Sequence, residues 1–220
     1  ALRHHPDFSQ ILELTGSGKL EIEMACGDLA EQLSSIPLFL RIMGLSPIDD
    51  LEIERMLTVL RHAMIKETEA GKTNEKGLPF SAALALQCFT NEYVFPETDE
   101  EKAAVEQLQQ QIATLVEKEQ EVPPSFVATL GAYRPLYSFP WAQELCEREW
   151  AGSIKEMIER QISEPQEEQS LRDQIPRLTP IQNTVSQSVR EQYEENPYPR
   201  WRYADIVPKN KFLTILNNNI

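Results

Sequence analysis

The sequence predicts an all-α fold, built as an irregular helical bundle or an array of helix pairs and followed by a C-terminal extended arm. Apolar residues recur at the i, i+3, i+4 spacing of a helix along most of the chain. Only two segments, 20–25 and 212–216, have the character of strands. The 15 prolines punctuate many predicted helix ends, as Pro37 does within residues 28–44.

Two long helices are predicted in the first half of the chain. Residues 49–71 have one apolar face, with Asp49 and Asp50 as candidate N-caps and Gly71 as the stop. Residues 79–95 are almost continuously apolar, so we expect this segment to supply the most buried helix of the domain.

The helical pattern continues through the middle of the chain. Residues 99–119 predict a helix with Asp99 as its N-cap and acidic residues in its first turn. Residues 124–139 favour two short helical pieces. Residues 141–162 favour an amphipathic helix with a break near Gly152.

The composition changes after this helical domain, which we place at residues 1–162. Residues 163–195 are polar and contain prolines, and they predict a connector with a short helix and then a linking helix. Asn196 precedes Pro197 and ends the linking helix, because the residue before proline avoids the α region. Residues 196–220 then form the extended arm.

The net charge of −14 is unevenly distributed along the chain. Residues 1–95 carry 8 basic and 14 acidic groups, residues 96–195 carry 9 and 20, and residues 196–220 carry 4 and 1. An acidic body repels phosphate backbones, which argues against nucleic acid as a partner. A neutral or basic partner fits this charge better, although ordinary solvation of the helices also accounts for it.

Membrane and secretory signals are not found in the sequence. No apolar run approaches the length of a membrane span, and no basic stretch followed by an apolar one opens the chain. The three cysteines, Cys26, Cys88 and Cys146, are far apart and fit reduced thiols buried among helices. These features predict a cytoplasmic protein that does not bind membranes.

The sequence presents no catalytic, cofactor-binding or metal-binding constellation. The three histidines, His4, His5 and His62, lack a further ligand at a useful spacing, so surface or core roles are expected. Residues 15–19 resemble part of a phosphate-binding loop but lack its first glycine and its Lys-Ser/Thr ending. The paired carboxylates fall in first turns or on solvated faces, and no nucleophile motif accompanies them.

A polar interruption in the apolar segment 79–95 marks a candidate groove. Asn91, Glu92 and Tyr93 stand together there and could line a binding site beside this helix. In the structural alternative, Asn91 and Glu92 cap neighbouring helices, and Tyr93 is a core residue with a hydrogen-bonded hydroxyl. The sequence favours the structural alternative.

The arm begins with 196-NPYPRW-201, which combines prolines, aromatic rings and an arginine. Prolines at alternate positions favour an extended, polyproline-like backbone after the helix stop. Aromatic residues flanked by arginine are typical of side chains that anchor one surface to another. The candidate interface residues are Tyr193, Asn196, Tyr198, Arg200 and Trp201.

The segment 189-VREQYEENPYPRW-201 closely resembles one found in bacterial SAM-dependent methyltransferases that often carry tetratricopeptide repeats. In that family the segment lies just before the class I methyltransferase domain. The stretches 51–65 and 82–101 resemble the helical region that precedes the segment in the same proteins. The resemblance therefore covers roughly residues 45–205.

This resemblance implies an accessory helical region that helps to bind a substrate or partner and is inactive alone. SAM is expected as the cofactor of the parent protein, with its binding strand and glycine-rich loop after Ile220, so no cofactor-binding residue falls in this chain. The arm would then pack against the downstream methyltransferase domain of the same polypeptide. In the fragment, the exposed rings of the arm could also pair two copies into a dimer.

Two other functions compete with this one. A helical-repeat-type interaction module would bind a protein or peptide in a groove without any tie to methyl transfer. A self-sufficient enzyme would need carboxylates or histidines that converge in a pocket. Whether the reading frame after Ile220 supplies a strand and a glycine-rich loop separates the first two functions.

Overall fold

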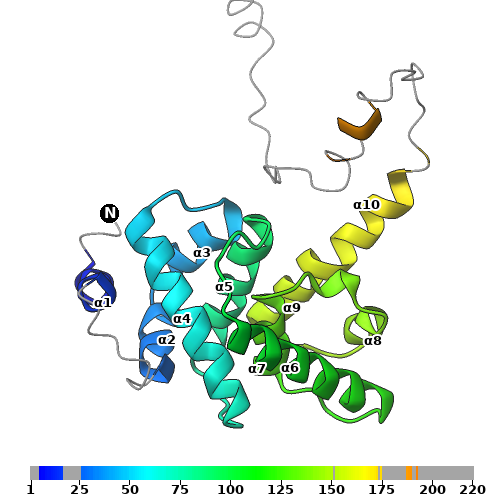
Figure 1. The fold of residues 1–220 in the computed structure, drawn as a ribbon, viewed down its shortest axis with the longest axis horizontal. Coiled ribbons are helices and arrows are strands. Elements are labelled where there is room, and N and C mark those ends of the chain that lie inside the picture. The colour runs from blue at the N-terminus through cyan, green and yellow to red at the C-terminus, as the bar shows by residue number, and fades with distance from the viewer. Residues whose placement is uncertain are drawn as a thin grey trace, which may run out of the picture.

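The computed structural model describes residues 5–16, 26–150, 152–172, 174, 187–189 and 192. All regular elements among these residues are helical (Figure 1), which confirms the all-α class. The two strand candidates, 20–25 and 212–216, lie outside the described residues.

The helical elements follow one another through mostly short connections. One of them, η2, is a 3-10 turn, and another, η3, is a π-helical turn. In chain order they are α1 (Pro6–Gly16), α2 (Cys26–Ser34), α3 (Pro37–Leu45), α4 (Leu51–Glu69), α5 (Leu78–Thr90), α6 (Asp99–Glu117), α7 (Pro124–Gly131), η2 (Leu136–Ser138), α8 (Ala142–Cys146), α9 (Gly152–Ile158), η3 (Glu159–Ser163) and α10 (Glu164–Arg172).

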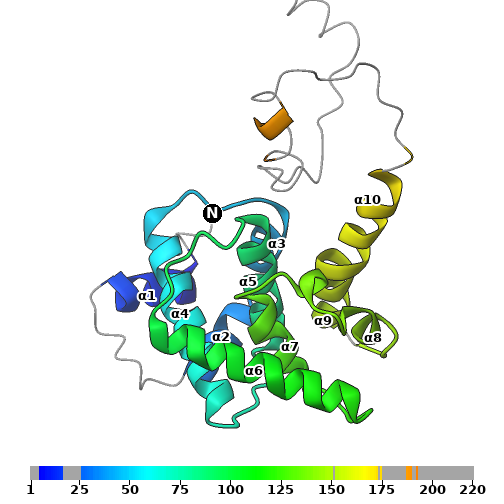
Figure 2. The ribbon, with the colours of Figure 1, turned by 45° about the vertical axis from the view of Figure 1, so that its right-hand side comes forward.

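Helix α5 forms the centre of the body. It packs against α2, α3, α7 and α9, and Figures 1 and 2 place it between its neighbours rather than at the surface. Ten of its 13 residues are buried. Small side chains at Ala82, Ala83 and Ala85 let neighbouring helices approach its backbone closely. The expectation that segment 79–95 supplies the most buried helix is confirmed.

Helix α4 begins and ends where the sequence indicates. Asp50 Oδ1 accepts hydrogen bonds from the first turn, with the Glu52 amide at 3.1 Å. After the helix, Gly71 has a φ of 68°, and the Lys72 amide donates to the Glu67 carbonyl oxygen at 3.0 Å. This left-handed glycine reverses the chain and lets a later amide satisfy a carbonyl that the helix end leaves free.

The N-cap of α6 is Thr98 rather than Asp99, which corrects the sequence-based prediction. Thr98 Oγ1 accepts from the Glu101 amide at 3.1 Å, and Glu101 Oε2 accepts from the Thr98 amide at 2.9 Å. This reciprocal capping box satisfies two amides at once. Asp99 in the cap position would have Lys102 three residues later, and lysine has no acceptor to return.

Helix α5 ends at Thr90, five residues before the predicted end of its segment at Phe95. Glu92 and Tyr93 have φ values of 50° and 56°, in the left-handed region where helices stop. Phe95 is nevertheless buried. The apolar character of these residues therefore reflects a packed loop, not a longer helix.

The segment 141–162 is divided near Gly152, as predicted. Helix α8 ends at Cys146, and Gly152 has a φ of 54° where α9 begins. From there the chain is helical to Arg172, through α9, the π turn η3 and α10. The expected boundary between residues 162 and 163 falls inside this run, because α10 continues the helix although none of its residues is buried.

Candidate functional site

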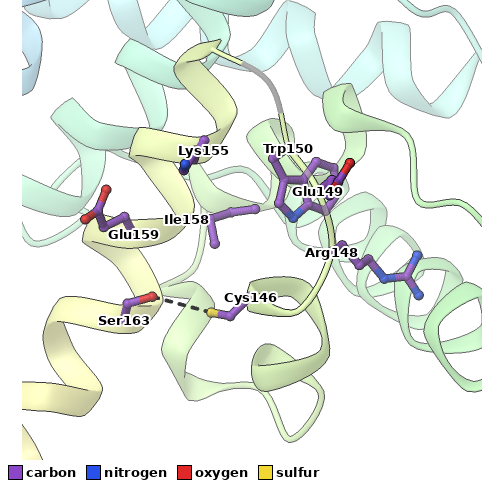
Figure 3. Close-up of a pocket in the computed structure, with 8 residues that line it drawn as sticks. All are labelled: Cys146, Arg148, Glu149, Trp150, Lys155, Ile158, Glu159 and Ser163. Carbon is purple, nitrogen blue, oxygen red and sulfur yellow. Dashed lines mark hydrogen bonds between the residues drawn. The ribbon is translucent and has the colours of Figure 1, made fainter.

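A cavity of about 580 Å³ opens between the α8–α9 loop and the helical run that starts at Gly152. Figure 3 shows the loop residues facing the helical run, with Ile158 between the two walls. The cavity is lined by Cys146, Arg148, Glu149, Trp150, Lys155, Ile158, Glu159 and Ser163.

Hydrogen bonds fix the loop wall of this cavity. Trp150 Nε1 donates to the Leu145 carbonyl oxygen at 2.6 Å, so the polar edge of the indole is already engaged. Arg148 Nη1 donates to the Gln120 carbonyl oxygen at 2.5 Å, which ties the loop to the end of α6. Across the cavity, Cys146 Sγ lies 3.6 Å from Ser163 Oγ. These contacts hold the α8–α9 loop against the residues after α6, and they hold the end of α8 against the end of η3.

Two further cavities lie along the same face and share lining residues in turn. The next, of about 360 Å³, shares the loop wall around Trp150 and adds Glu121 and Pro124. The third, of about 390 Å³, shares Glu121 and Pro124 and reaches Glu75 in the α4–α5 loop. We call these three neighbouring cavities together the loop groove, because their walls come mainly from the α4–α5, α6–α7 and α8–α9 loops.

The loop groove is lined by more acidic than basic side chains. Its basic groups are Lys155 and Arg148, and the latter already binds a backbone carbonyl. Its apolar surface includes the half-buried Trp150 ring and the adjacent prolines Pro123 and Pro124. The four acidic residues, all exposed, are Glu75, Glu121, Glu149 and Glu159.

A second polar cluster is packed inside the body between α4, α6 and the end of α7. Arg61 is fully buried, and its guanidinium carbon lies 4.3 Å from the ring centre of Tyr133 and 5.2 Å from that of Phe95. Arg61 Nη2 donates to the Pro96 carbonyl oxygen at 2.7 Å. Tyr133 Oη donates to Glu101 Oε1 at 2.7 Å, so a buried carboxylate and a buried guanidinium share one aromatic neighbour.

The pKa values of three groups in and beside this cluster, Glu101, Tyr133 and Cys88, are shifted further away from neutral pH. Burial by itself raises the pKa of Glu101, but hydrogen bonds from Thr98 and Tyr133 outweigh burial, and the net pKa is lowered. Burial and the Glu101 hydrogen bond raise the pKa of Tyr133 far above its ordinary value. Burial also raises the pKa of Cys88 to about 12. The carboxylate, phenol and thiol therefore keep fixed protonation states near pH 7 and serve packing.

The π turn η3 carries two buried polar side chains that join several helices. Gln161 Nε2 donates to the carbonyl oxygens of Ala85 and Gly131, both at 3.0 Å, and Gln161 Oε1 accepts from the Leu136 amide at 3.3 Å. Arg160 Nη1 donates to the Gly44 carbonyl oxygen at the end of α3. A β-carbon at Gly131 would lie 3.3 Å from Gln161, so the glycine permits this close approach.

The three residues considered for a groove at the end of α5 make contacts within the body. Asn91 is the C-cap of α5, and its backbone N–H donates to the Gln87 carbonyl oxygen. Tyr93 Oη donates to the Gly131 carbonyl oxygen at 3.2 Å and lies 3.4 Å from Gln161 Oε1. Glu92 lies between them in the left-handed turn. None of the three lines the loop groove.

The five interface candidates, Tyr193, Asn196, Tyr198, Arg200 and Trp201, lie outside the described residues. Of the cysteines, Cys88 is buried as expected, whereas Cys146 is only partly buried and lines the loop groove. His62 is also partly buried, with Nδ1 3.5 Å from Glu101 Oε2. Sequence reasoning missed the loop groove, because its walls come from loops that are far apart in the sequence.

Neither a metal-binding cluster nor a membrane-spanning helix occurs in the described part of the chain. Within residues 5–16, 26–150 and 152–172, no three His, Cys, Asp or Glu side chains converge as metal ligands. No helix in these ranges combines the length and apolar character that crossing a bilayer requires. No protein-family model, curated protein or solved structure matches this chain.

Proposed function

We propose that this chain is an accessory helical region of a SAM-dependent methyltransferase and binds a substrate or partner rather than catalysing transfer itself. The support from the sequence is the resemblance carried by residues 189–201, with 51–65 and 82–101 upstream. In this proposal the cofactor domain follows Ile220, SAM binds there, and the protein acts in the cytoplasm of a bacterium.

The observation that carries the proposal is the loop groove. It is formed by three loops of a well-packed body, as binding sites often are, and its walls offer carboxylates beside an indole ring. Such a surface suits an extended basic segment with apolar side chains. It therefore favours a binding role for this region of the protein.

Helix α10 gives a second support. It projects from the body in Figures 1 and 2, and none of its residues is buried. A helix that is polar on every side is typical of a solvated bridge between parts of a protein. It precedes the segment 189–201 in the chain, which is where the resemblance places the joint with a catalytic domain.

A helical interaction module that binds a peptide without any tie to methyl transfer is the second candidate. The same loop groove favours it, since the groove alone does not require a catalytic domain. SAM titration separates the two candidates. Calorimetry should show binding to the protein extended past Ile220 and none to this chain alone. Binding by neither would favour the interaction module, and binding by this chain alone would contradict the placement of the cofactor site.

A further inference from the structure

The loop groove has the chemistry of a site for an extended peptide with basic and aromatic side chains. Its three cavities share lining residues in turn, so their walls follow one another from Glu75 past Glu121 to Glu149. The half-buried ring of Trp150 and the Pro124 ring supply flat apolar surface along that path. Proline-rich segments bind to aromatic surfaces of this kind because their backbone is already extended.

One segment of this chain has the complementary chemistry. Residues 196–202, Asn-Pro-Tyr-Pro-Arg-Trp-Arg, contain two arginines and no acidic residue. They follow a body whose segment 96–195 carries 9 basic and 20 acidic groups. Arginine forms bidentate hydrogen bonds with carboxylates, and the paired charges steer such a segment toward an acidic groove.

The chain is long enough for this segment to return to the groove. Ser163 lines the groove and directly precedes α10, which has nine residues and is about 14 Å long. Between Arg172 and Pro197 lie 24 residues, which can span up to about 80 Å when extended. This reach exceeds the length of α10 several times, so an intramolecular contact is sterically accessible.

We propose that residues 196–202 dock in the loop groove of their own chain, with Arg200 and Arg202 beside Glu121 and Glu149. The rings of Tyr198 and Trp201 pack against Trp150 and Pro124. The contact holds the start of the arm on the body, close to the groove. This inference does not require methyl transfer, because it concerns only groups within this chain.

Site-specific photo-crosslinking of the full chain tests the docking. A photoreactive benzoylphenylalanine replaces Tyr198, and mass spectrometry locates the residues that it captures on irradiation at low protein concentration. We expect most products to lie within residues 73–78, 121–125 and 148–154 of the same chain. The double variant Glu121→Lys/Glu149→Lys should reduce this capture at least fivefold.

The matched control is Glu13→Lys/Glu106→Lys, which makes the same charge change at two exposed positions outside the groove. It should leave the capture within twofold of the parent chain. A charge swap that adds Arg200→Glu/Arg202→Glu to the groove variant should restore part of the capture. Circular dichroism checks that each variant keeps its helical content.

Several results would overturn the proposal. Capture spread over the body, or capture that the groove variant leaves unchanged, would show that the segment does not dock there. Products of twice the chain mass would assign the groove to a second copy of the chain. The outcome is independent of SAM titration, so failure of the methyltransferase proposal and failure of this docking can be told apart.

Discussion

Replacing Gln161 by methionine should destabilise the protein strongly, because this fully buried side chain joins α5, α7 and η2 to the π turn. Methionine has nearly the same length and fills the same space but offers no amide. The Leu136 amide then loses the Gln161 Oε1 acceptor, at a cost of about 1–3 kcal/mol. The carbonyl oxygens of Ala85 and Gly131 each lose one donor, at a further cost of about 1 kcal/mol in total.

The expected loss is therefore about 3 kcal/mol in the free energy of unfolding. For a chain of this size, the corresponding decrease in Tm is about 6–12 °C. Urea unfolding followed by far-ultraviolet circular dichroism measures the free energy. The control is Gln166→Met, at an exposed position in α10, which should stay within about 0.5 kcal/mol of the parent protein.

The variant Gln161→Glu adds a test in which the direction of the pH dependence of stability is predicted. Its carboxyl group faces the carbonyl oxygens of Ala85 and Gly131, to which only the protonated form can donate. The folded-state pKa of the new group therefore rises above its unfolded value of about 4.3. Relative to the parent protein, the variant is most stable at pH values below the unfolded pKa. It loses stability as the pH rises from there through the raised folded-state pKa. A loss under 1 kcal/mol for Gln161→Met, or a pH-independent difference for Gln161→Glu, would refute this reasoning.

Three further predictions concern the caps and the buried cluster. Thr98→Ala removes the threonine side chain from the capping box and should lower the free energy of unfolding in urea by about 1 kcal/mol. The control Thr114→Ala, on the exposed side of α6, should cost less. Equal effects of the two substitutions would contradict the role of Thr98 as the cap. Glu101→Gln should be less stable than the parent protein at neutral pH. The difference in the free energy of unfolding, followed by urea unfolding at several pH values, should shrink as pH falls through the lowered pKa of Glu101. The reason is that the stability contributed by a carboxylate with a depressed pKa is lost when the carboxylate is protonated. A difference that grows in acid would reverse this assignment. Cys88 has a pKa of about 12 and no exposed surface, so it should resist iodoacetamide in the native protein. Cys146, on the wall of the loop groove, should react. Peptide mapping distinguishes the two cysteines, and equal labelling would contradict the burial of Cys88.

The sequence predicted α4 and α6 because each buries one apolar face that repeats with the helical period, and it predicted α5 because its segment is apolar almost throughout. The sequence analysis placed the cap of α6 at Asp99, one residue after the Thr98 cap that the structure shows. The deciding residue is Glu101, three positions after Thr98, which completes a capping box that Asp99 cannot form. The end of α5 was missed because Glu92 and Tyr93 adopt left-handed backbone without a glycine, so composition gave no stop signal.

The loop groove lay beyond prediction for a different reason. Its walls join Glu75, Glu121 and Trp150, which are far apart in the sequence and meet only after the helices pack. Helical periodicity predicts which face of a helix is buried, but it does not predict which loops lie side by side. Gln161 shows the same limit, because its partners Ala85 and Gly131 lie 76 and 30 positions away.

The π turn η3 also determines the direction in which the chain leaves the body. A π turn is equivalent to one extra residue inserted into an α-helix, and each residue rotates a helix by about 100°. Because Arg160 and Gln161 fix the turn to three helices, α10 has a defined rotation about its axis as well as a defined direction. Deleting one residue from this turn would rotate every side chain of α10 by about a quarter of a circle relative to the body. The side chains of α10 therefore take their angular setting relative to the body from the five residues of η3.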